Sequence, residues 1–244
     1  MTLATSSGNE LLELLTRYNE DLWPAHLATY SLVVAAVGLL FVRRGHLADR
    51  TIAGVLAALW LWLGVVFQAM YATDVDLVLG VVYTCLFVVQ AYLLTRVAVR
   101  GHVAFCIRNG RSGVLGWTML AYATAIYPVL GLLLGHGWPE APLLGMAPCP
   151  TVIATFGFLL LARPPIPVRL LVVPFIWALL APPAAMGRGV YEDAGLLLAG
   201  VLTVVVISIR DHWRRPRARR DPDVPQAHAP DAPGRPHPVT PFLA

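Results

Sequence analysis

Seven long apolar stretches, separated by short polar connections, dominate the pattern of the chain. A helix needs about 20 apolar residues to cross the ~30 Å hydrocarbon core of a bilayer, and each stretch reaches or approaches that length. The pattern therefore predicts an all-α polytopic integral membrane protein, a bundle of seven transmembrane helices. The predicted spans are Ala25–Val42, Thr51–Tyr71, Leu77–Leu94, Val114–Gly135, Cys149–Ala162, Leu170–Met186 and Ala194–Ile209.

Composition agrees with this prediction. Hydrophobic residues make up 57% of the 244 residues and charged residues 13%, against roughly 45–50% and 25% in soluble domains. A water-soluble fold of this length would lack the polar surface needed to cover itself. The composition therefore favours the bilayer as the solvent of the chain.

Charge sets the expected orientation. All 18 basic residues are arginine, and the absence of lysine excludes a retinal Schiff base in this seven-span pattern. Arginine concentrates in the cytoplasmic connections of membrane proteins, so we expect the N-terminus outside and the C-terminus in the cytoplasm. The arginines on the predicted cytoplasmic side are Arg43, Arg44, Arg50, Arg96, Arg100, Arg108, Arg111, Arg163, Arg169, Arg210, Arg214, Arg215, Arg217, Arg219 and Arg220.

Two segments flank the predicted spans. Residues 1–24 have the spacing of an amphipathic helix on the membrane surface, with Trp23-Pro24 at its end. It is expected to act as an anchor, or as a lid over an outward-facing site. Residues 25–210 form the transmembrane domain, and residues 211–244 are first basic and then proline-rich. We expect the basic part of this tail to contact anionic lipid and the rest to be disordered, with no nucleic-acid binding.

Candidate chemistry concentrates between Tyr127 and Thr155 and before the last span. Prolines around Cys149 interrupt regular helix and leave backbone groups to face a cavity or ligand. Glu192 and Asp193 lie at a helix start, where the dipole favours carboxylates and a helix cap is the alternative. The apolar, proline-rich connector Trp138–Ala147 is expected to pack into the bundle. We expect an outward-facing pocket lined by this connector, the start of the seventh span and the His26 end of the first span. Its predicted ligand-binding residues are His26, Tyr127, His136, Glu140, Cys149, Thr151, Thr155, Tyr191, Glu192 and Asp193.

Other site chemistries find less support in the sequence. Scattered His, Cys and acidic residues could bind a metal, but no pair has ligand spacing, so no metal and no cofactor is expected. No nucleophile, metalloprotease or phosphate-binding motif is present. An intramembrane enzyme built on Cys149 with His136 is the alternative. Polar residues within the spans, such as Gln68, Tyr83 and Gln90, are expected to form hydrogen bonds between helices.

Several short motifs resemble those of a group of bacterial multi-span membrane proteins that is classed as a domain of unknown function. The resemblance covers roughly the first 210 residues and implies a membrane location, with no activity, substrate or cofactor. It rests on Tyr18-Asn19-Glu20, Trp23-Pro24, Tyr127-Pro128, Gly135-His136, Pro139, Pro142, Gly145, Pro148-Cys149-Pro150-Thr151, Phe156-Gly157 and Glu192-Asp193.

The sequence thus predicts a protein of the bacterial inner membrane with a small solute as ligand. A small-solute permease or channel-like protein is the function we expect. A ligand-binding sensor or accessory protein, and an intramembrane enzyme, are the alternatives. The broken helices near the outer face favour a solute site, because backbone groups freed from helices line such cavities.

Overall fold

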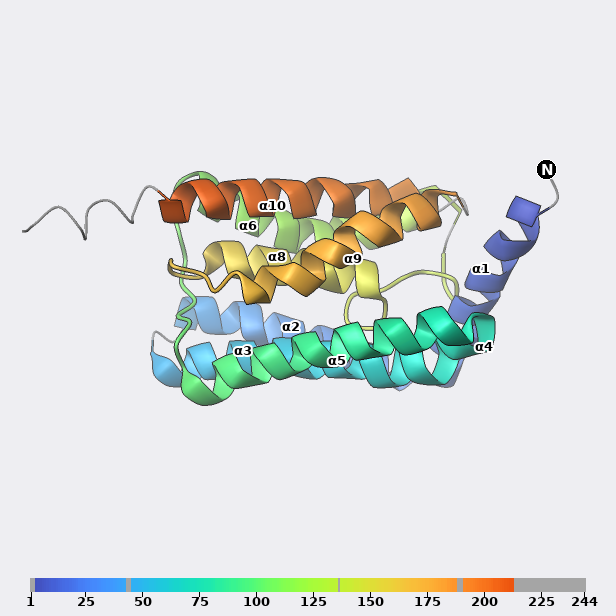
Figure 1. Cartoon of the computed structure of the whole chain (residues 1–244), viewed down its shortest axis with the longest axis horizontal. Coiled ribbons are helices and arrows are strands. Elements are labelled where there is room, and N and C mark those ends of the chain that lie inside the picture. Colours follow the sequence, from blue (N-terminus) through green and yellow to red (C-terminus); the bar gives the residue numbers. More distant parts are fainter. Residues whose placement is uncertain (1–2, 43–44, 136, 188–190, 213–244) are drawn as a thin grey trace, which may run out of the picture.

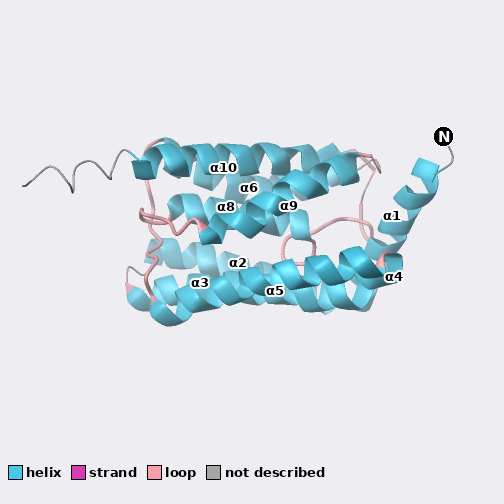
Figure 2. Cartoon of the chain, viewed as in Figure 1, coloured by secondary structure: helices cyan, strands magenta, loops and turns pink. Residues whose placement is uncertain are grey.

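Long, nearly parallel helices run between two ends of one bundle (Figure 1). The computed structural model describes residues 3–42, 45–135, 137–187 and 191–212. Helices account for almost all of this part of the chain; most loops lie at the ends of the bundle, and the long loop over residues 138–147 reaches between the helices (Figure 2). No strand occurs in the described ranges, where only two isolated bridges are found. The predicted all-α class is confirmed.

The N-terminal half contains five helices and one π-helical segment. Helix α1 lies across one end of the bundle, at an angle to the others (Figure 1). We call this end the α1 end and the opposite end the arginine-rich end. The elements are α1 (Leu3–Asp21), α2 (Trp23–Val42), α3 (His46–Trp62), the π-helix η1 (Leu63–Ala72), α4 (Thr73–Val75) and α5 (Leu77–Arg100).

The C-terminal half crosses the bundle with α6 to α10. The π-helix η2 precedes Pro128, whose ring cannot donate the backbone bond of a regular helix. The elements are α6 (Arg111–Ala121), η2 (Tyr122–Ile126), α7 (Tyr127–Leu133), α8 (Pro148–Leu161), α9 (Arg169–Met186), the 3₁₀ turn η3 (Tyr191–Asp193) and α10 (Ala194–His212).

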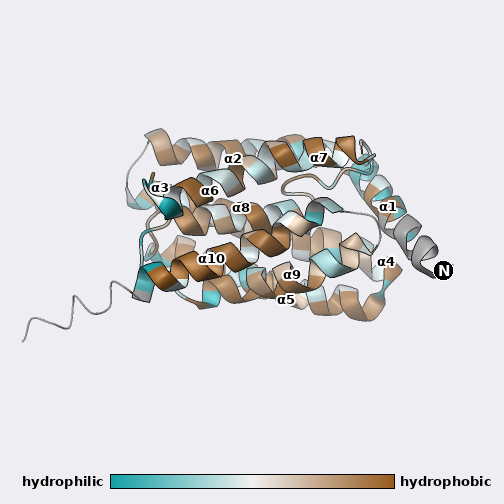
Figure 3. Cartoon of the chain, turned by 90° about the horizontal axis from the view of Figure 1, so that it is seen from above, coloured by the Kyte–Doolittle hydropathy of each residue, from teal (hydrophilic) through white to brown (hydrophobic). Residues whose placement is uncertain are grey.

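Six helical segments are long and apolar enough to cross a membrane. Their outward faces are hydrophobic over most of their length (Figure 3). Exposed residues there include Val78 and Leu133, which are 71% and 76% exposed. An apolar surface of this kind suits lipid rather than water. The chain is therefore an integral membrane protein by helix length and composition.

Helix α8 differs from the six spanning segments. It has 14 residues, which is about 21 Å of helix and shorter than the hydrocarbon core. It runs through the middle of the bundle in two perpendicular views (Figures 1 and 3). All of its residues except Cys149 are buried. Helix α8 corresponds to the fifth predicted span, so the count of seven spans stays a prediction, as does the orientation of the termini.

The connector between α7 and α8 packs into the α1 end. Residues 141, 142 and 144–147 are buried, whereas Trp138 is 57% exposed. Asn19 Nδ2 donates a hydrogen bond to the Ala141 carbonyl at 3.0 Å. Gly145 has φ +82° and lies against Thr29, where a Cβ atom would come within 2.5 Å of the Thr29 side chain. The apolar connector is thus part of the core, as its sequence predicted.

Candidate functional site

A cavity of about 220 Å³ opens at the α1 end of the bundle. We call it the α1-end cavity. Its wall combines apolar side chains from α1, η1, α5 and α9 with the first residues of α8 and with η3. The lining residues are Leu14, Leu15, Phe67, Gln68, Ala72, Val75, Asp76, Leu79, Gly80, Tyr83, Tyr127, Pro142, Ala147, Pro148, Cys149, Trp177, Leu180, Ala181, Ala184, Ala185 and Asp193.

Three predicted site residues meet at one wall of the α1-end cavity. Tyr127 begins α7, Cys149 lies in the first turn of α8, and Asp193 ends η3 just before α10. The Tyr127 hydroxyl donates a hydrogen bond to Asp193 Oδ1, and the Cys149 thiol donates to Asp193 Oδ2 at 3.2 Å. Tyr127 is 1% exposed and Asp193 3% exposed. Because both oxygens accept a hydrogen bond, the buried carboxylate is held in one orientation.

Three further polar side chains line the cavity at positions that the sequence did not identify as site residues. Gln68, in η1, is 2% exposed, and Tyr83 lies on α5. Trp177, in α9, packs edge-on against Tyr83 with ring centroids 5.0 Å apart. The buried Trp177 Nε1 has no acceptor among the residues that the structure describes. A buried donor without an acceptor is costly, so a ligand acceptor here would remove that cost.

The shape of the cavity depends on two close helix contacts. At Gly64, in η1, a Cβ atom would lie 3.0 Å from the Phe87 Cβ atom of α5. At Gly80 a Cβ atom would lie 2.7 Å from Thr73 Cγ2. Only glycine permits these approaches, so η1 and α4 lie directly against α5. π-Helical segments are frequent at functional sites, and η1 carries Gln68 into this cavity.

Helix α1 covers the cavity at its outer side. Leu14 and Leu15 line it. Tyr18 packs edge-on against Phe67 with centroids 5.1 Å apart, and its hydroxyl accepts a hydrogen bond from Trp62 Nε1 at 2.8 Å. Burial raises the pKa of Tyr18 above its usual range, so the phenol remains protonated. Exposed polar contacts add to this packing: Arg17 pairs with Asp74 at 3.2 Å.

Thr151 and Thr155 are buried and take part in packing rather than lining the α1-end cavity. Thr151 Oγ1 accepts a hydrogen bond from the Gly145 backbone N–H and donates to the Ala147 carbonyl, both at 2.8 Å. Thr155 Oγ1 accepts from Trp60 Nε1 at 3.0 Å. The two threonines therefore fix the connector and α3 against α8.

His26 also holds the connector and does not line the cavity. Its Nε2 lies 3.1 Å from Asn19 Oδ1, and its Nδ1 lies 3.1 Å from the Trp23 carbonyl. Asn19 in turn donates to the connector carbonyls of Pro139 and Ala141. His26 therefore takes part in holding the connector, and a role for it in ligand binding stays a prediction.

The remaining predicted residues divide into two groups. Glu140 is partly exposed and Tyr191 is 59% exposed, and neither lines the α1-end cavity. His136 and the side chain of Glu192 lie outside the described residues. Metal binding finds no support in the described ranges, which contain no group of three or more His, Cys, Asp or Glu side chains suited to hold an ion. Their three cysteines are free thiols.

Comparison with known proteins places the chain in a family. The model of DUF6064, a family of unknown function, matches residues 9–218. The chain belongs to this family. The DUF6064 match includes every residue that lines the α1-end cavity, and it confirms the expected resemblance to a family of unknown function. No curated protein and no solved structure matches the chain.

Proposed function

We propose that this DUF6064 protein is a small-solute permease whose solute binds in the α1-end cavity. The observation that carries the proposal is the cavity itself. It lies within a bundle of membrane-spanning length, and its lining includes the buried polar residues Gln68 and Asp193. Broken and π-helical segments around it agree with solute sites in transporters, where backbone irregularity lines a cavity.

Cavity chemistry defines the solute class. The lining is mainly apolar, and its polar side chains include Gln68, Tyr83 and Trp177. A volume of about 220 Å³ is smaller than pockets for drug-sized ligands, which measure about 300–1,000 Å³. The proposed solute is therefore small and largely apolar, with one oxygen that accepts a hydrogen bond. The Trp177 indole N–H is the proposed donor.

Helix α9 supplies the proposed moving part. It contains Pro174, Pro182 and Pro183, each of which removes a backbone hydrogen bond and weakens the helix at that point. Its second half lines the α1-end cavity, and its first half lines a second hollow at the arginine-rich end. A bend of α9 at its prolines would change both ends of the bundle together.

A sensor is the second candidate, and the position of α1 favours it. Helix α1 closes the cavity through exposed contacts, such as Arg17 with Asp74 and Tyr71 with Asp21 at 3.1 Å, and through the buried Tyr18. The exposed contacts contribute little each, so Tyr18 is the residue that solute binding would have to displace to move α1. In a sensor the bound solute would move α1 and no flux would follow. The enzyme alternative would require His136 beside Cys149.

Binding can be tested with purified protein and small probes of defined chemistry. We expect benzyl alcohol and acetophenone to raise the melting temperature, and toluene, which has no oxygen, to raise it less. Trp177→Phe should weaken acetophenone binding about three- to tenfold, the effect of one neutral hydrogen bond, and leave toluene unchanged. Ala181→Phe should fill the cavity and abolish the response, whereas Ala58→Phe, on an exposed position of α3, should keep it.

Transport requires a separate measurement. Stopped-flow exchange of acetophenone across the membrane should be faster in proteoliposomes than in empty vesicles, and Ala181→Phe should return the exchange to the empty-vesicle rate. Binding without uptake would replace the permease with the sensor. Equal responses of Trp177→Phe, Ala181→Phe and the parent to all probes would remove the cavity from the function.

A further inference from the structure

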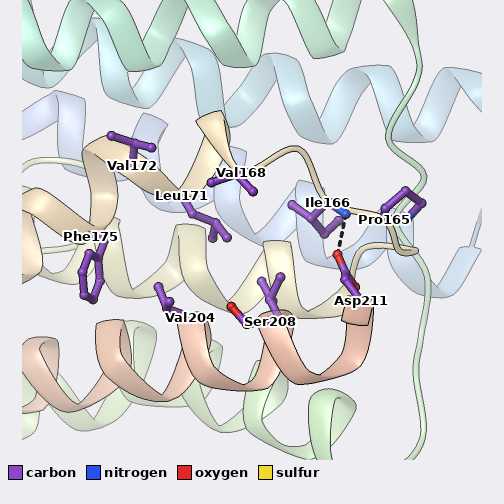
Figure 4. Close-up of a pocket in the computed structure, with 10 residues that line it drawn as sticks. Pro165, Ile166, Val168, Leu171, Val172, Phe175, Val204, Ser208 and Asp211 are labelled. Carbon is purple, nitrogen blue, oxygen red and sulfur yellow. Dashed lines mark hydrogen bonds between the residues drawn. The ribbon is translucent and has the colours of Figure 1, made fainter. Parts of the chain in front are cut away.

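A groove of about 330 Å³ opens between α9, α10 and the loop before α9, at the arginine-rich end (Figure 4). We call it the α9–α10 groove. Leu171 and Ile207 are buried in its floor at 6% and 3% exposure, whereas Val168 and Val172 at its rim are 70% and 46% exposed. The lining residues are Pro165, Ile166, Val168, Leu171, Val172, Phe175, Val204, Ile207, Ser208 and Asp211.

The position of the groove points to lipid. Both α9 and α10 are among the segments of spanning length, so an apolar groove at their ends faces the boundary between acyl chains and headgroups. The groove has a volume of about 330 Å³, which is less than one turn of a helix about 10 Å in diameter would fill. It therefore suits one hydrocarbon chain better than a helix of a second copy.

The polar end of the groove carries no free negative charge. Asp211 is the only acidic residue of the lining, and both of its oxygens accept hydrogen bonds. Oδ1 accepts from Arg210 Nε at 2.9 Å, and Oδ2 accepts from the Ile166 backbone N–H at 2.9 Å (Figure 4). The Arg210 guanidinium neutralises this carboxylate, with side chains only 9% and 13% exposed.

Exposed arginines surround that end. Arg163 and Arg169 lie at the two ends of the loop that forms one wall of the groove, and both are exposed. Their neighbourhood is strongly positive: partial burial lowers the pKa of His102, and the charges of Arg169, Arg100 and Arg96 lower it further. A phosphate would be attracted to this face, because arginine binds phosphate oxygens through paired N–H groups.

We infer that the α9–α10 groove is a site for an anionic phospholipid. One acyl chain lies in the groove between Val172 and Val204, and the phosphate is bound by Arg163 and Arg169. Each basic residue near an anionic membrane surface tightens binding about fivefold. This site is separate from the basic segment after α10 and from the α1-end cavity.

The test uses the full chain in a neutral detergent, titrated with defined lipids. Native mass spectrometry and thermal unfolding should show tighter binding of dioleoyl phosphatidylglycerol than of dioleoyl phosphatidylcholine. Arg163→Gln and Arg169→Gln should each weaken phosphatidylglycerol binding about fivefold and leave phosphatidylcholine unchanged. Arg111→Gln removes an exposed arginine from the same end of the bundle but outside the groove, and it should have no effect.

Groove shape is tested separately from charge. Val172→Trp should exclude the acyl chain and weaken both lipids, whereas Val99→Trp, on an exposed position of α5, should not. Glycerol 1-phosphate should not bind, because it lacks the chain. Equal affinity for the two lipids, an equal effect of Arg111→Gln, or saturation by glycerol 1-phosphate alone would overturn the site. A second copy of the chain bound in the groove would also overturn the lipid site. If a variant fails to fold, the preference of the parent protein for phosphatidylglycerol over phosphatidylcholine still tests the site.

Discussion

Trp60 Nε1 donates a hydrogen bond to Thr155 Oγ1 at 3.0 Å, and both residues are completely buried. The contact joins α3 to the central helix α8 at a point with no access to water. A buried indole N–H that loses its acceptor costs about 1–3 kcal/mol. The loss of unfolding free energy when this hydrogen bond is removed therefore reports how strongly α3 holds α8 in the bundle.

We expect Thr155→Val to lower the free energy of unfolding by about 1–3 kcal/mol, because it leaves the Trp60 N–H unsatisfied. Thr95→Val is the control: Thr95, like Thr155, donates to a carbonyl four residues earlier, but within the described part of the chain it accepts no hydrogen bond from another helix. Trp60→Phe in the Thr155→Val background should recover part of the loss. Unfolding in detergent by denaturant measures all three, and equal losses for the two threonines would contradict the prediction.

The Arg210–Asp211 pair should be far more sensitive than the Arg17–Asp74 pair. Asp211→Ala leaves a guanidinium that is 9% exposed without its counter-charge, and breaking such a buried pair costs about 3–5 kcal/mol. Asp74→Ala breaks a pair whose side chains are 63% and 57% exposed, which should cost about 0–1 kcal/mol. Thermal unfolding of the two variants compares them. Similar shifts would show that Arg210 finds other partners.

Gly157→Ala and Gly38→Ala should have opposite effects. A Cβ atom on Gly157 would lie 2.9 Å from Leu120 Cγ and 3.0 Å from the Gly116 carbonyl oxygen, whereas one on Gly38 meets nothing within 4 Å. We expect Gly157→Ala to force α6 and α8 apart at a cost of about 1–3 kcal/mol. Gly38→Ala should stabilise α2 by up to about 1 kcal/mol. The order of the two melting temperatures checks the prediction, and a stable Gly157→Ala would mean that the helices shift easily.

Orientation in the membrane can be read by labelling. In a background with Cys85, Cys106 and Cys149 replaced, single cysteines at Thr5 and Pro230 should differ in intact cells. The arginine asymmetry predicts labelling of Thr5→Cys by an impermeant maleimide and no labelling of Pro230→Cys until the cells are opened. Labelling at position 230 in intact cells would reverse the assignment and, with it, the outward direction of the α1-end cavity.

Hydropathy predicted the helices well because the bilayer imposes a length and a composition on every spanning segment. It also identified the fifth stretch as short, and the structure shows α8 as a buried helix of 14 residues. The apolar connector was predicted to pack inward for the same reason. Hydropathy predicts these features because the preference of a segment for lipid or water depends on its own residues and not on its neighbours in the fold.

Side-chain direction and partner choice could not be predicted in that way. The sequence placed Cys149 and Asp193 at one end of the bundle, where they are hydrogen-bonded, but it could not show that Thr151 points into a packing contact. Gln68 and Trp177 were not predicted to line the cavity, because the sequence of an apolar helix does not show which of its faces borders a cavity. Arg210 was counted only among the arginines of the predicted cytoplasmic side. Its neighbour Asp211, directly at the end of an apolar span, was the signal for a buried pair.

The enclosure of α8 has a consequence for how the protein is made. A segment of about 21 Å is a poor candidate for release into lipid on its own, and almost every side chain of α8 is covered by other helices of the same chain. Neighbours on both sides in the sequence contribute to this cover, including α6, which is made before it, and α9 and α10, which are made after it. Biogenesis therefore cannot finish helix by helix: α8 has to wait at the insertion machinery, or pair with α6, until the last two helices arrive.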